Sequence, residues 1–368
     1  MDVRFYDKDF NLIHIEPLYK SINHELKFNG MGTFEMCVPL QSGLSGIIYS
    51  NDFLVAEQKG HMALITTTHL SDSEIVLYGR TLNFLLEKRV SFPFEKSGTD
   101  AVEKVKELVT SAFEDVIFES EAEEAGESEY FVEREESLLE TVCSILEEKK
   151  LGHSFTFDLK RRKWVFRILK GREEKFLLSE SLLNMYAFEK SQSVLEFANC
   201  GYYYQDATYM GTWDAHNNNP PIEETTANIG KVYQVLYPGE RFGEKWETGD
   251  FVCFDRADGK VSKRDNSPSG FYVLIGGEKT DGGRFECFIN EDNLSDALKA
   301  FAKIKKENRV VAKVRNVTFG KDYFLGDRVI LCKKAGETII NEEMRITGVS
   351  IWQQNADEGE MPVFTGED

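Results

Sequence analysis

The segment 43–47 comes closer to a catalytic motif than the other serine-containing segments of this sequence. It reads Gly-Leu-Ser-Gly-Ile, whereas a nucleophile elbow needs Gly-x-Ser-x-Gly so that a sharp turn presents the serine. The second glycine stands one position too early for that turn. We therefore expect an ordinary loop here and no serine nucleophile.

The histidines and cysteines do not form a metal-binding pattern. His61 and His69 share one face of an expected strand, but eight residues of extended chain separate them by about 26 Å, too far to share an ion. The other four histidines are isolated in the sequence: His14, His24, His153 and His216. No two cysteines have the short spacing of a zinc knuckle, so we expect small buried apolar side chains. They are Cys37, Cys143, Cys200, Cys253, Cys287 and Cys332.

Two glycine-containing segments resemble ligand-binding loops only in part. Segment 276–283 lacks the Gly-Lys-Ser/Thr ending of a phosphate loop and carries two carboxylates, so we expect a flexible hairpin turn. Segment 255–259 reads Asp-Arg-Ala-Asp-Gly, lacks the middle and later ligands of a calcium loop, and is typical of a hairpin turn.

Paired carboxylates are the remaining catalytic possibility. A wall-cleaving glycosidase needs only two of them, and 63 acidic residues provide many close pairs by chance. No feature of the sequence singles out one pair. We therefore predict no catalytic, cofactor-binding or metal-binding residue, no cofactor and no enzymatic activity, with a wall hydrolase kept as the alternative.

Length and charge set further limits. At ~150 residues per domain, 368 residues correspond to two or three domains. A formal net charge of −19 repels phosphate backbones, so we expect no sequence-specific binding of nucleic acid.

The longest apolar run, 271–275, is far shorter than the ~18 residues that cross a bilayer, so we expect no membrane span. The N-terminus does not resemble a signal peptide, and we expect a soluble chain kept in the cytoplasm.

Charge is concentrated in two neighbouring segments. Residues 112–150 hold 14 acidic and three basic side chains, a net charge of −11. One interpretation is a solvated, mobile loop around 119–129, and the other is an acidic surface that repels DNA or meets a basic partner. Residues 160–175 hold eight basic and two acidic side chains, and the tip at 160–163 is expected to be solvated. The two patches could also pair between subunits, so the role of the segment from Glu114 to Glu136 stays open.

The spacing of apolar residues predicts a β-rich chain with helical insertions. The first 90 residues predict a meander with strands at 22–28, 33–38, 53–56, 62–70 and 75–78. A helix is predicted from Asp100, which resembles a capping box with Glu103, and a second from Ser137 and Glu140. A hairpin at 154–158 and 164–169 completes an α/β insertion.

Strands are predicted again in the second half of the chain. They lie at 186–188, 194–198, 202–204, 232–236, 251–254, 271–275 and 284–289, and again over the final sixty residues. A loop is expected between 204 and 232, because Asn217-Asn218-Asn219-Pro220-Pro221 cannot be a central strand. A third helix is predicted after Asn293, with Lys303, Lys305 and Lys306 near its C-terminal end.

The last strands repeat the order of the first ones. Residues 51–55, 65–66 and 77–79 match 326–330, 346–347 and 363–366 in order and chemistry. The spacing differs, with 13 and 13 residues between the first set and 19 and 18 between the second. Longer hairpin loops explain that difference, and the pattern hints at duplication, although any two antiparallel meanders share turn residues.

These residues resemble a known family. The run 32–39 (Gly-Thr-Phe-Glu-Met-Cys-Val-Pro), followed by Asn51-Asp52-Phe53 and the segment 77–89, is similar to the opening of siphovirus and prophage tail hub proteins. The C-terminal part of the chain is also similar to these proteins, with Tyr323-Phe324-Leu325-Gly326-Asp327-Arg328-Val329 followed by Arg345-Ile346-Thr347. Residues 236–308 fit the family pattern least well.

The resemblance implies a fold and a domain organisation. It implies a β-rich α+β fold with two small barrel-like β domains and α/β insertions. We expect the first barrel at 1–90, the α/β insertion at 91–175, the second barrel at 176–235 with 309–368, and a β-hairpin and helix insertion at 236–308.

The resemblance also implies a function. The chain would be a structural hub of a phage or phage-like tail tip, a virion component assembled in the bacterial host cytoplasm. A homotrimeric ring would join the sixfold tail tube to the threefold tip and leave an axial channel for DNA or tape-measure protein. Implied partners are further copies of the chain, the tail tube or distal tail protein, the tape-measure protein and a tip or fibre protein. The alternative is a tail-associated cell-wall hydrolase or glycan-binding module.

Overall fold

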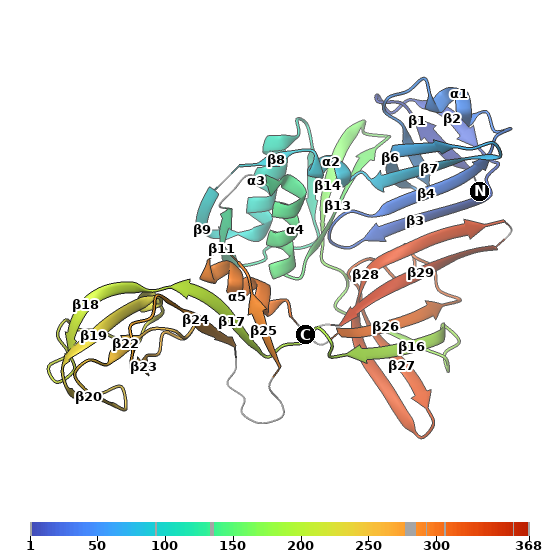
Figure 1. Ribbon diagram of the computed structural model, residues 1–368. Coiled ribbons are helices and arrows are strands. Elements are labelled where there is room, and N and C mark those ends of the chain that lie inside the picture. The colour runs from blue at the N-terminus through green and yellow to red at the C-terminus, as the bar shows by residue number, and fades with distance from the viewer. Residues whose placement is uncertain are drawn as a thin grey trace. The chain divides into compact units, whose positions relative to one another are not determined.

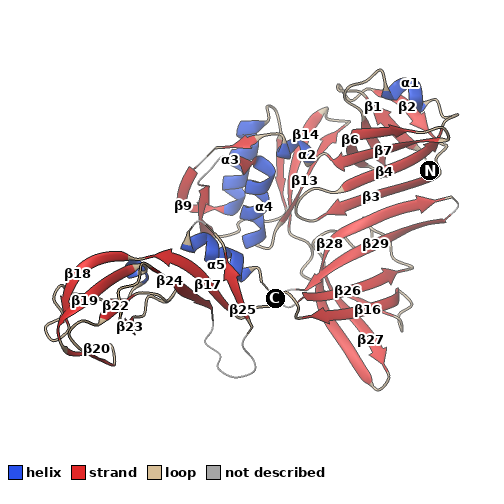
Figure 2. Ribbon diagram, viewed as in Figure 1, coloured by secondary structure: helices blue, strands red, loops and turns tan. Residues whose placement is uncertain are grey.

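A computed structural model describes residues 2–92, 94–132, 136–276, 285–291, 293–304, 307–355 and 357–366. Strands predominate and the few helices are short (Figure 2), so the predicted β-rich α+β fold is confirmed. No helix in the described residues is long and apolar enough to cross a membrane.

The chain divides into two compact units. The first unit comprises Met1–Lys190 with Arg309–Asp368, and the second comprises Ser191–Asn308. Residues 191–235 therefore lie with 236–308, and not with 309–368 as expected for a second barrel.

One large sheet organises the first unit. Its order is β15-β27-β28-β3-β4-β7-β6-β5-β1-β2, and β29 pairs with β28 off this path (Figure 1). The N-terminal strands are β1 Val3–Tyr6, β2 Leu12–Glu16, β3 Ser21–Lys27, β4 Thr33–Pro39, β5 Val55–Gln58, β6 His61–Leu70 and β7 Glu74–Thr81. The others are β15 Phe176–Ser179, β27 Arg328–Ala335, β28 Thr338–Gln354 and β29 Asp357–Gly366.

Pairing between β3 and β28 joins the two ends of the chain in this sheet. Gly348 to Gln354 of β28 pair antiparallel with Lys27 to Ser21 of β3. Strand β3 alternates buried and exposed residues, so Ile22, His24 and Leu26 face the core. The strands expected to form two separate barrels therefore belong to one sheet, joined by the pairing of β3 with β28.

Two meanders within the sheet have the same geometry. Strands β5-β6-β7 and β27-β28-β29 are each three consecutive antiparallel strands. The register shifts after Ile65 in the β6–β7 pair and after Ile346 in the β28–β29 pair, so both meanders carry a bulge at the predicted Ile-Thr match. The structure thus supports the correspondence seen in the sequence.

The insertion forms an α/β layer within the first unit. Its elements are α2 Phe84–Glu87, β8 Val90–Ser91, β9 Phe94–Asp100, α3 Ala101–Ala112, β10 Ile117–Ser120, β11 Glu127–Val132, β12 Glu136–Ser137, α4 Leu138–Glu148, β13 Gly152–Asp158 and β14 Lys163–Leu169. Strands β10-β14-β13 form a three-stranded sheet, and α3 and α4 pack on one face of it through a shared apolar core.

The caps at the two helix starts explain why sequence periodicity located these helices. Ser137 and Glu140 form the predicted capping box of α4. Asp100 caps α3 by accepting a hydrogen bond from the Val102 amide, rather than through a reciprocal box with Glu103. The predicted hairpin is confirmed as β13 and β14.

The second unit contains several small sheets and one helix. The sheets have the orders β24-β17-β25, β18-β19-β22-β23 and β20-β21. The elements are β17 Cys200–Asp206, β18 Thr208–Asp214, a 3-10 turn Thr226–Asn228, β19 Lys231–Tyr237, β20 Gly239–Arg241, β21 Glu244–Trp246, β22 Phe251–Cys253, β23 Ser262–Arg264, β24 Gly270–Gly276, β25 Glu286–Ile289 and α5 Leu294–Ala302. Strands β16 Met185–Ser193 and β26 Glu307–Val314 pair with each other where the two units connect.

Three local predictions differ from the structure. Segment 43–47 is not a loop, because Leu44–Ile48 form the short helix α1, which buries Leu44 and Ile48. Residues 194–198 are not a strand. The expected loop after 204 contains strand β18, which pairs parallel with β19 at a shifted register, and local alternation does not reveal such a pair.

The third helix is confirmed with Asn293 as its cap, while Lys305 and Lys306 lie outside the described residues.

Candidate functional site

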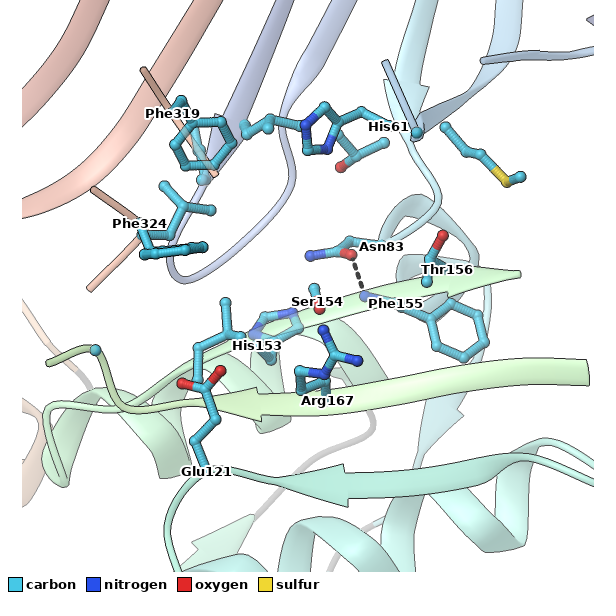
Figure 3. Close-up of a pocket in the computed structure, with 18 of the residues that line it drawn as sticks. His61, Asn83, Glu121, His153, Ser154, Phe155, Thr156, Arg167, Phe319 and Phe324 are labelled. Carbon is cyan, nitrogen blue, oxygen red and sulfur yellow. Dashed lines mark hydrogen bonds between the residues drawn. The ribbon is translucent and has the colours of Figure 1, made fainter. Parts of the chain in front are cut away.

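A cleft of about 580 Å³ lies within the first unit, between the insertion sheet and the large sheet. Figure 3 shows His61, Phe319 and Phe324 on one side of it and Ser154, Arg167 and Glu121 on the other. Its lining residues are distant in sequence, from Leu26 to Asp327, which is why no local motif predicted it. A volume of this size is in the range of ligand pockets.

The two walls of the cleft differ in chemistry. Leu26, Met62 and Leu325 add apolar surface to the lining, and Figure 3 shows Phe319 and Phe324 on the side of His61. On the other side lies β13, where Ser154 and Thr156 line the cleft and Phe155 reaches it from the helix core. The cleft therefore combines an apolar surface with hydroxyls and charges.

Arg167 on the polar wall is held by an acidic neighbour. Its Nε and Nη2 donate to one carboxylate oxygen of Glu119, at 3.0 and 2.6 Å. Arg161 also pairs with Glu119, at 3.2 Å. Hydrogen bonds from Arg167, and then from Arg161, hold the pKa of Glu119 below its usual value. Part of the acidic segment is thus ion-paired with the basic segment of the same chain, while residues 133–135 lie outside the described residues.

A buried carboxylate ties the end of the insertion to the C-terminal strands. Asp327 is 1% exposed and accepts hydrogen bonds from the backbone amides of Arg172 (2.9 Å) and Phe324 (2.8 Å). The Arg172 guanidinium also donates to it and stacks over the Phe324 ring at 4.9 Å. The hydrogen bond to Asp327 raises the pKa of Arg172. Asp327 lines the cleft and holds the Arg172 end of the insertion against the segment that contains Phe324.

Close backbone contacts fix the insertion against β3 and β28. The Phe28 carbonyl accepts from the His153 amide at 2.8 Å, and the Phe28 amide donates to the Thr347 carbonyl at 2.8 Å. A Cβ at Gly152 would lie 2.1 Å from the Phe28 oxygen, so only glycine fits there. Gly326 has φ +87° and also lies against Phe28. The cleft walls are therefore held by backbone, not by side chains alone.

Two histidines that are isolated in sequence meet beside the cleft. The rings of His24 and His61 lie 6.0 Å apart, and the His61 ring also contacts Phe319. Neither ring nitrogen of the fully buried His24 has a hydrogen-bond partner among the described residues. Burial, and to a smaller extent His61, lowers the pKa of His24 to about 3. Burial lowers the pKa of His61 to about 4 against the opposing effect of Glu57. Both rings are neutral at pH 7.

The remaining candidate residues from the sequence lie on several separate elements. His61 and His69 both lie on β6, and His69 is exposed. Segment 255–259 connects the antiparallel strands β22 and β23. Of segment 276–283, only Gly276 lies within the described residues. Among the described residues no three histidine, cysteine or acidic side chains are grouped to hold a metal ion, and the cysteines are free thiols, three buried and three half-buried.

The basic hairpin tip is exposed and also contacts the first strands. Arg162 donates from Nη1 to the Phe10 carbonyl at 2.8 Å, and its Nη2 donates to the Asp9 carbonyl. Beneath it, the Phe10 and Phe157 rings stack with centroids 3.8 Å apart. Residues 160–162 are exposed, as expected of a solvated tip, and Arg162 in addition holds the insertion to the first strands.

Replacing Arg162 by alanine is expected to lower the free energy of unfolding of the first unit by about 1–2 kcal/mol, because two carbonyls lose a charged donor. Urea denaturation measures this change. Lys160→Ala at the same tip is the matched control, since the Lys160 side chain is exposed, and it should change stability by less than about 0.5 kcal/mol. Equal effects of the two substitutions would contradict the docking role.

Comparisons with known proteins agree with this architecture. No protein-family model matches the sequence, and no curated protein sequence does. Among solved structures, the tail protein from Neisseria meningitidis MC58 aligns with 100% of this chain and 96% of its own, with a TM-score of 0.53 and 12% identity. The 43 kDa tail protein of prophage MuSo2 from Shewanella oneidensis covers 100% and 98%, with a TM-score of 0.53 and 11% identity.

A third structure covers the chain to a similar extent. Prophage tail protein gp18 from Listeria monocytogenes EGD-e aligns with 100% of this chain and 95% of its own, with a TM-score of 0.51 and 11% identity. At such low identity the match concerns the fold, and it runs over the whole length of the chain. The resemblance noted in the sequence is thus confirmed at the level of architecture: the chain has the fold of prophage tail proteins.

Proposed function

We propose that the chain is a structural hub of a phage or phage-like tail tip. The observation that carries this proposal is the full-length match of its fold to three phage tail proteins. In the assembled virion, three copies form a ring that joins the sixfold tail tube to the threefold tip. The ring leaves an axial channel for DNA or tape-measure protein.

The repeated meander supports the change of symmetry. Each chain contributes β5-β6-β7 and β27-β28-β29, which share strand order, direction and the position of one bulge. Three chains would therefore offer six similar surfaces to a sixfold tube, whereas a single meander per chain would offer three.

Open strand edges offer a means of assembly. The large sheet ends at β2 and β15, whose outer edges pair with no other described strand. Unpaired edges are templates for pairing with another chain. The partners in this proposal are further copies of the chain, the tail tube or distal tail protein, the tape-measure protein and a tip or fibre protein.

The proposal assigns no enzymatic activity to the chain. Its net charge of −19 suits a conduit that must not adhere to phosphates. The alternative, a tail-associated wall hydrolase, predicts that the pure protein releases muropeptides or sugars from peptidoglycan. Sustained release that survives repurification would favour that alternative.

The subunit count tests the hub directly. We expect three copies of the 42.1 kDa chain per tail in purified particles, measured by native mass spectrometry of detached tips. Electron microscopy of the same tips should show six similar lobes around the axis. A different stoichiometry, or lobes not spaced by about sixty degrees, would overturn the ring.

A further inference from the structure

One face of a sheet in the second unit is aromatic and open. The sheet β24-β17-β25 packs its other face on α5, where Phe301 lies against Gly201. Because side chains alternate along a strand, Tyr202 and Tyr204 lie on the face opposite Tyr203. The register places Tyr272 beside Tyr204 and Phe288 beside Tyr202. Four aromatic side chains therefore share this face.

The four rings form a row. Centroids are 5.5 Å apart from Tyr204 to Tyr272, 5.5 Å from Tyr272 to Phe288, and 6.1 Å from Phe288 to Tyr202. Tyr204 is 48% exposed, Tyr272 54% and Phe288 74%. Single exposed apolar residues are ordinary, but a contiguous aromatic row marks an interaction site.

The row is small for a protein interface. The rings occupy two register positions on three strands, and at ~4.8 Å per strand and ~6.7 Å per position they cover roughly 200 Å². A stable protein–protein interface takes about 800 Å² from each partner. The area suits a ligand of a few rings.

Charge at the ends of the row limits the class of that ligand. Asp206 and Glu286 lie on the same face, and Glu286 accepts a hydrogen bond from the Tyr202 hydroxyl at 3.3 Å. No lysine or arginine of β17, β24 or β25 lies on this face, and Arg256, whose backbone bridges to Leu274, is paired with Asp258. Phosphate polymers are therefore repelled.

The arrangement also disfavours a cation cage. Recognition of an ammonium or guanidinium group uses rings that enclose one point, whereas Tyr204, Tyr272 and Phe288 lie on an open sheet face and are 48–74% exposed. A linear ligand with both apolar and hydroxyl-bearing surfaces fits a row of this kind.

We propose that this row binds an uncharged glycan chain. The C–H faces of its sugars pack on Tyr204, Tyr272 and Phe288, and its hydroxyls donate to the carboxylates of Asp206 and Glu286. The site adds recognition to the structural role and does not rest on it. The subunit count tests the hub and a titration tests this face, so each can fail separately.

Calorimetric titration of the full chain tests the proposal. The probes are the neutral oligosaccharides chitotetraose and cellotetraose, the anionic tetragalacturonate, and a tetra-arginine peptide. The test variant is Tyr272→Ala/Phe288→Ala. The matched control is Tyr49→Ala/Phe92→Ala, which removes one tyrosine and one phenylalanine of similar exposure, 65% and 72%, from the first unit.

We expect saturable binding of at least one neutral probe, a tenfold or greater loss in the test variant, and no change in the control. Phe288→Tyr should retain binding, which separates a lost contact from lost folding. Absence of saturable binding of both neutral probes would overturn the proposal, as would equal losses in the two double variants. Binding of tetra-arginine or tetragalacturonate alone would assign the face to a different ligand class.

Discussion

Replacing Asp327 by alanine is expected to destabilise the first unit by about 3 kcal/mol. The substitution removes a carboxylate that is 1% exposed and leaves two backbone amides without their acceptor, while the Arg172 guanidinium keeps only its bond to the Asp322 carbonyl. Breaking a buried pair by removing one partner costs about 3–5 kcal/mol, and the half-exposed Arg172 places this case at the low end.

Urea denaturation of the full chain measures the effect of this substitution, and an exposed ion pair provides the control. Lys175 and Glu343 lie 2.6 Å apart near the same strands, with both side chains largely exposed, so Glu343→Gln should cost less than about 1 kcal/mol. Asp327→Asn should fall between wild type and Asp327→Ala, because the amide still accepts hydrogen bonds but carries no charge. A loss below 1 kcal/mol for Asp327→Ala would show that Asp327 is not the anchor of this wall.

This anchor gives a physical reason for one of the segments that resembles tail hub proteins. Gly326 and Asp327 belong to the similarity noted in the sequence, which did not indicate their role. In the structure the glycine takes φ +87° against Phe28, and the aspartate binds the end of the insertion. The segment therefore holds the end of the insertion against the C-terminal strands.

The accuracy of the sequence predictions followed how local each interaction is. Helix α4 was predictable because its capping box and apolar spacing lie within eleven residues. The pairing of β3 with β28 joins residues more than 300 positions apart, and nothing in either strand specifies its partner. The cleft could not be predicted for the same reason, since its walls come from Leu26, Ser154 and Phe319.

The charged segments show a second limit. Composition revealed an acidic and a basic stretch, and the structure pairs part of one with the other, as in Glu119 with Arg167. The parallel register of β10 on β14 brings these two residues together, and parallel pairing needs a crossover that local patterns do not show.

The stability of the first unit is expected to fall steeply between pH 6.5 and pH 5. His24, His61 and His153 lie in this unit, and burial lowers their pKa values to about 3, 4 and 4. In the unfolded chain a histidine has a pKa near 6.5. Below pH 6.5 the unfolded state therefore binds protons that the folded state does not, and each histidine costs about 2 kcal/mol of stability by pH 5.

Urea denaturation at pH 7 and pH 5 measures this loss, which should total about 4–6 kcal/mol. His24→Leu should reduce the pH dependence by about 2 kcal/mol whatever its effect at pH 7, because leucine does not titrate and the His24 nitrogens have no partners to lose. His69→Gln, at an exposed position of the same strand β6 that carries His61, should leave the pH dependence unchanged.

The pH window separates these histidines from the carboxylates. Glu119 and Asp158 have lowered pKa values, so their contribution to stability is present above their unfolded pKa values and is lost below about pH 5. Loss of stability that begins near pH 6.5 therefore reports the buried imidazoles. Two results would contradict this prediction: a loss of stability that begins only below pH 5, or a His24→Leu variant that keeps the full pH dependence. Either result would mean that the rings of His24 and His61 are solvated or paired in solution. The apolar wall beside the cleft would then be less tightly closed than the burial of these rings implies.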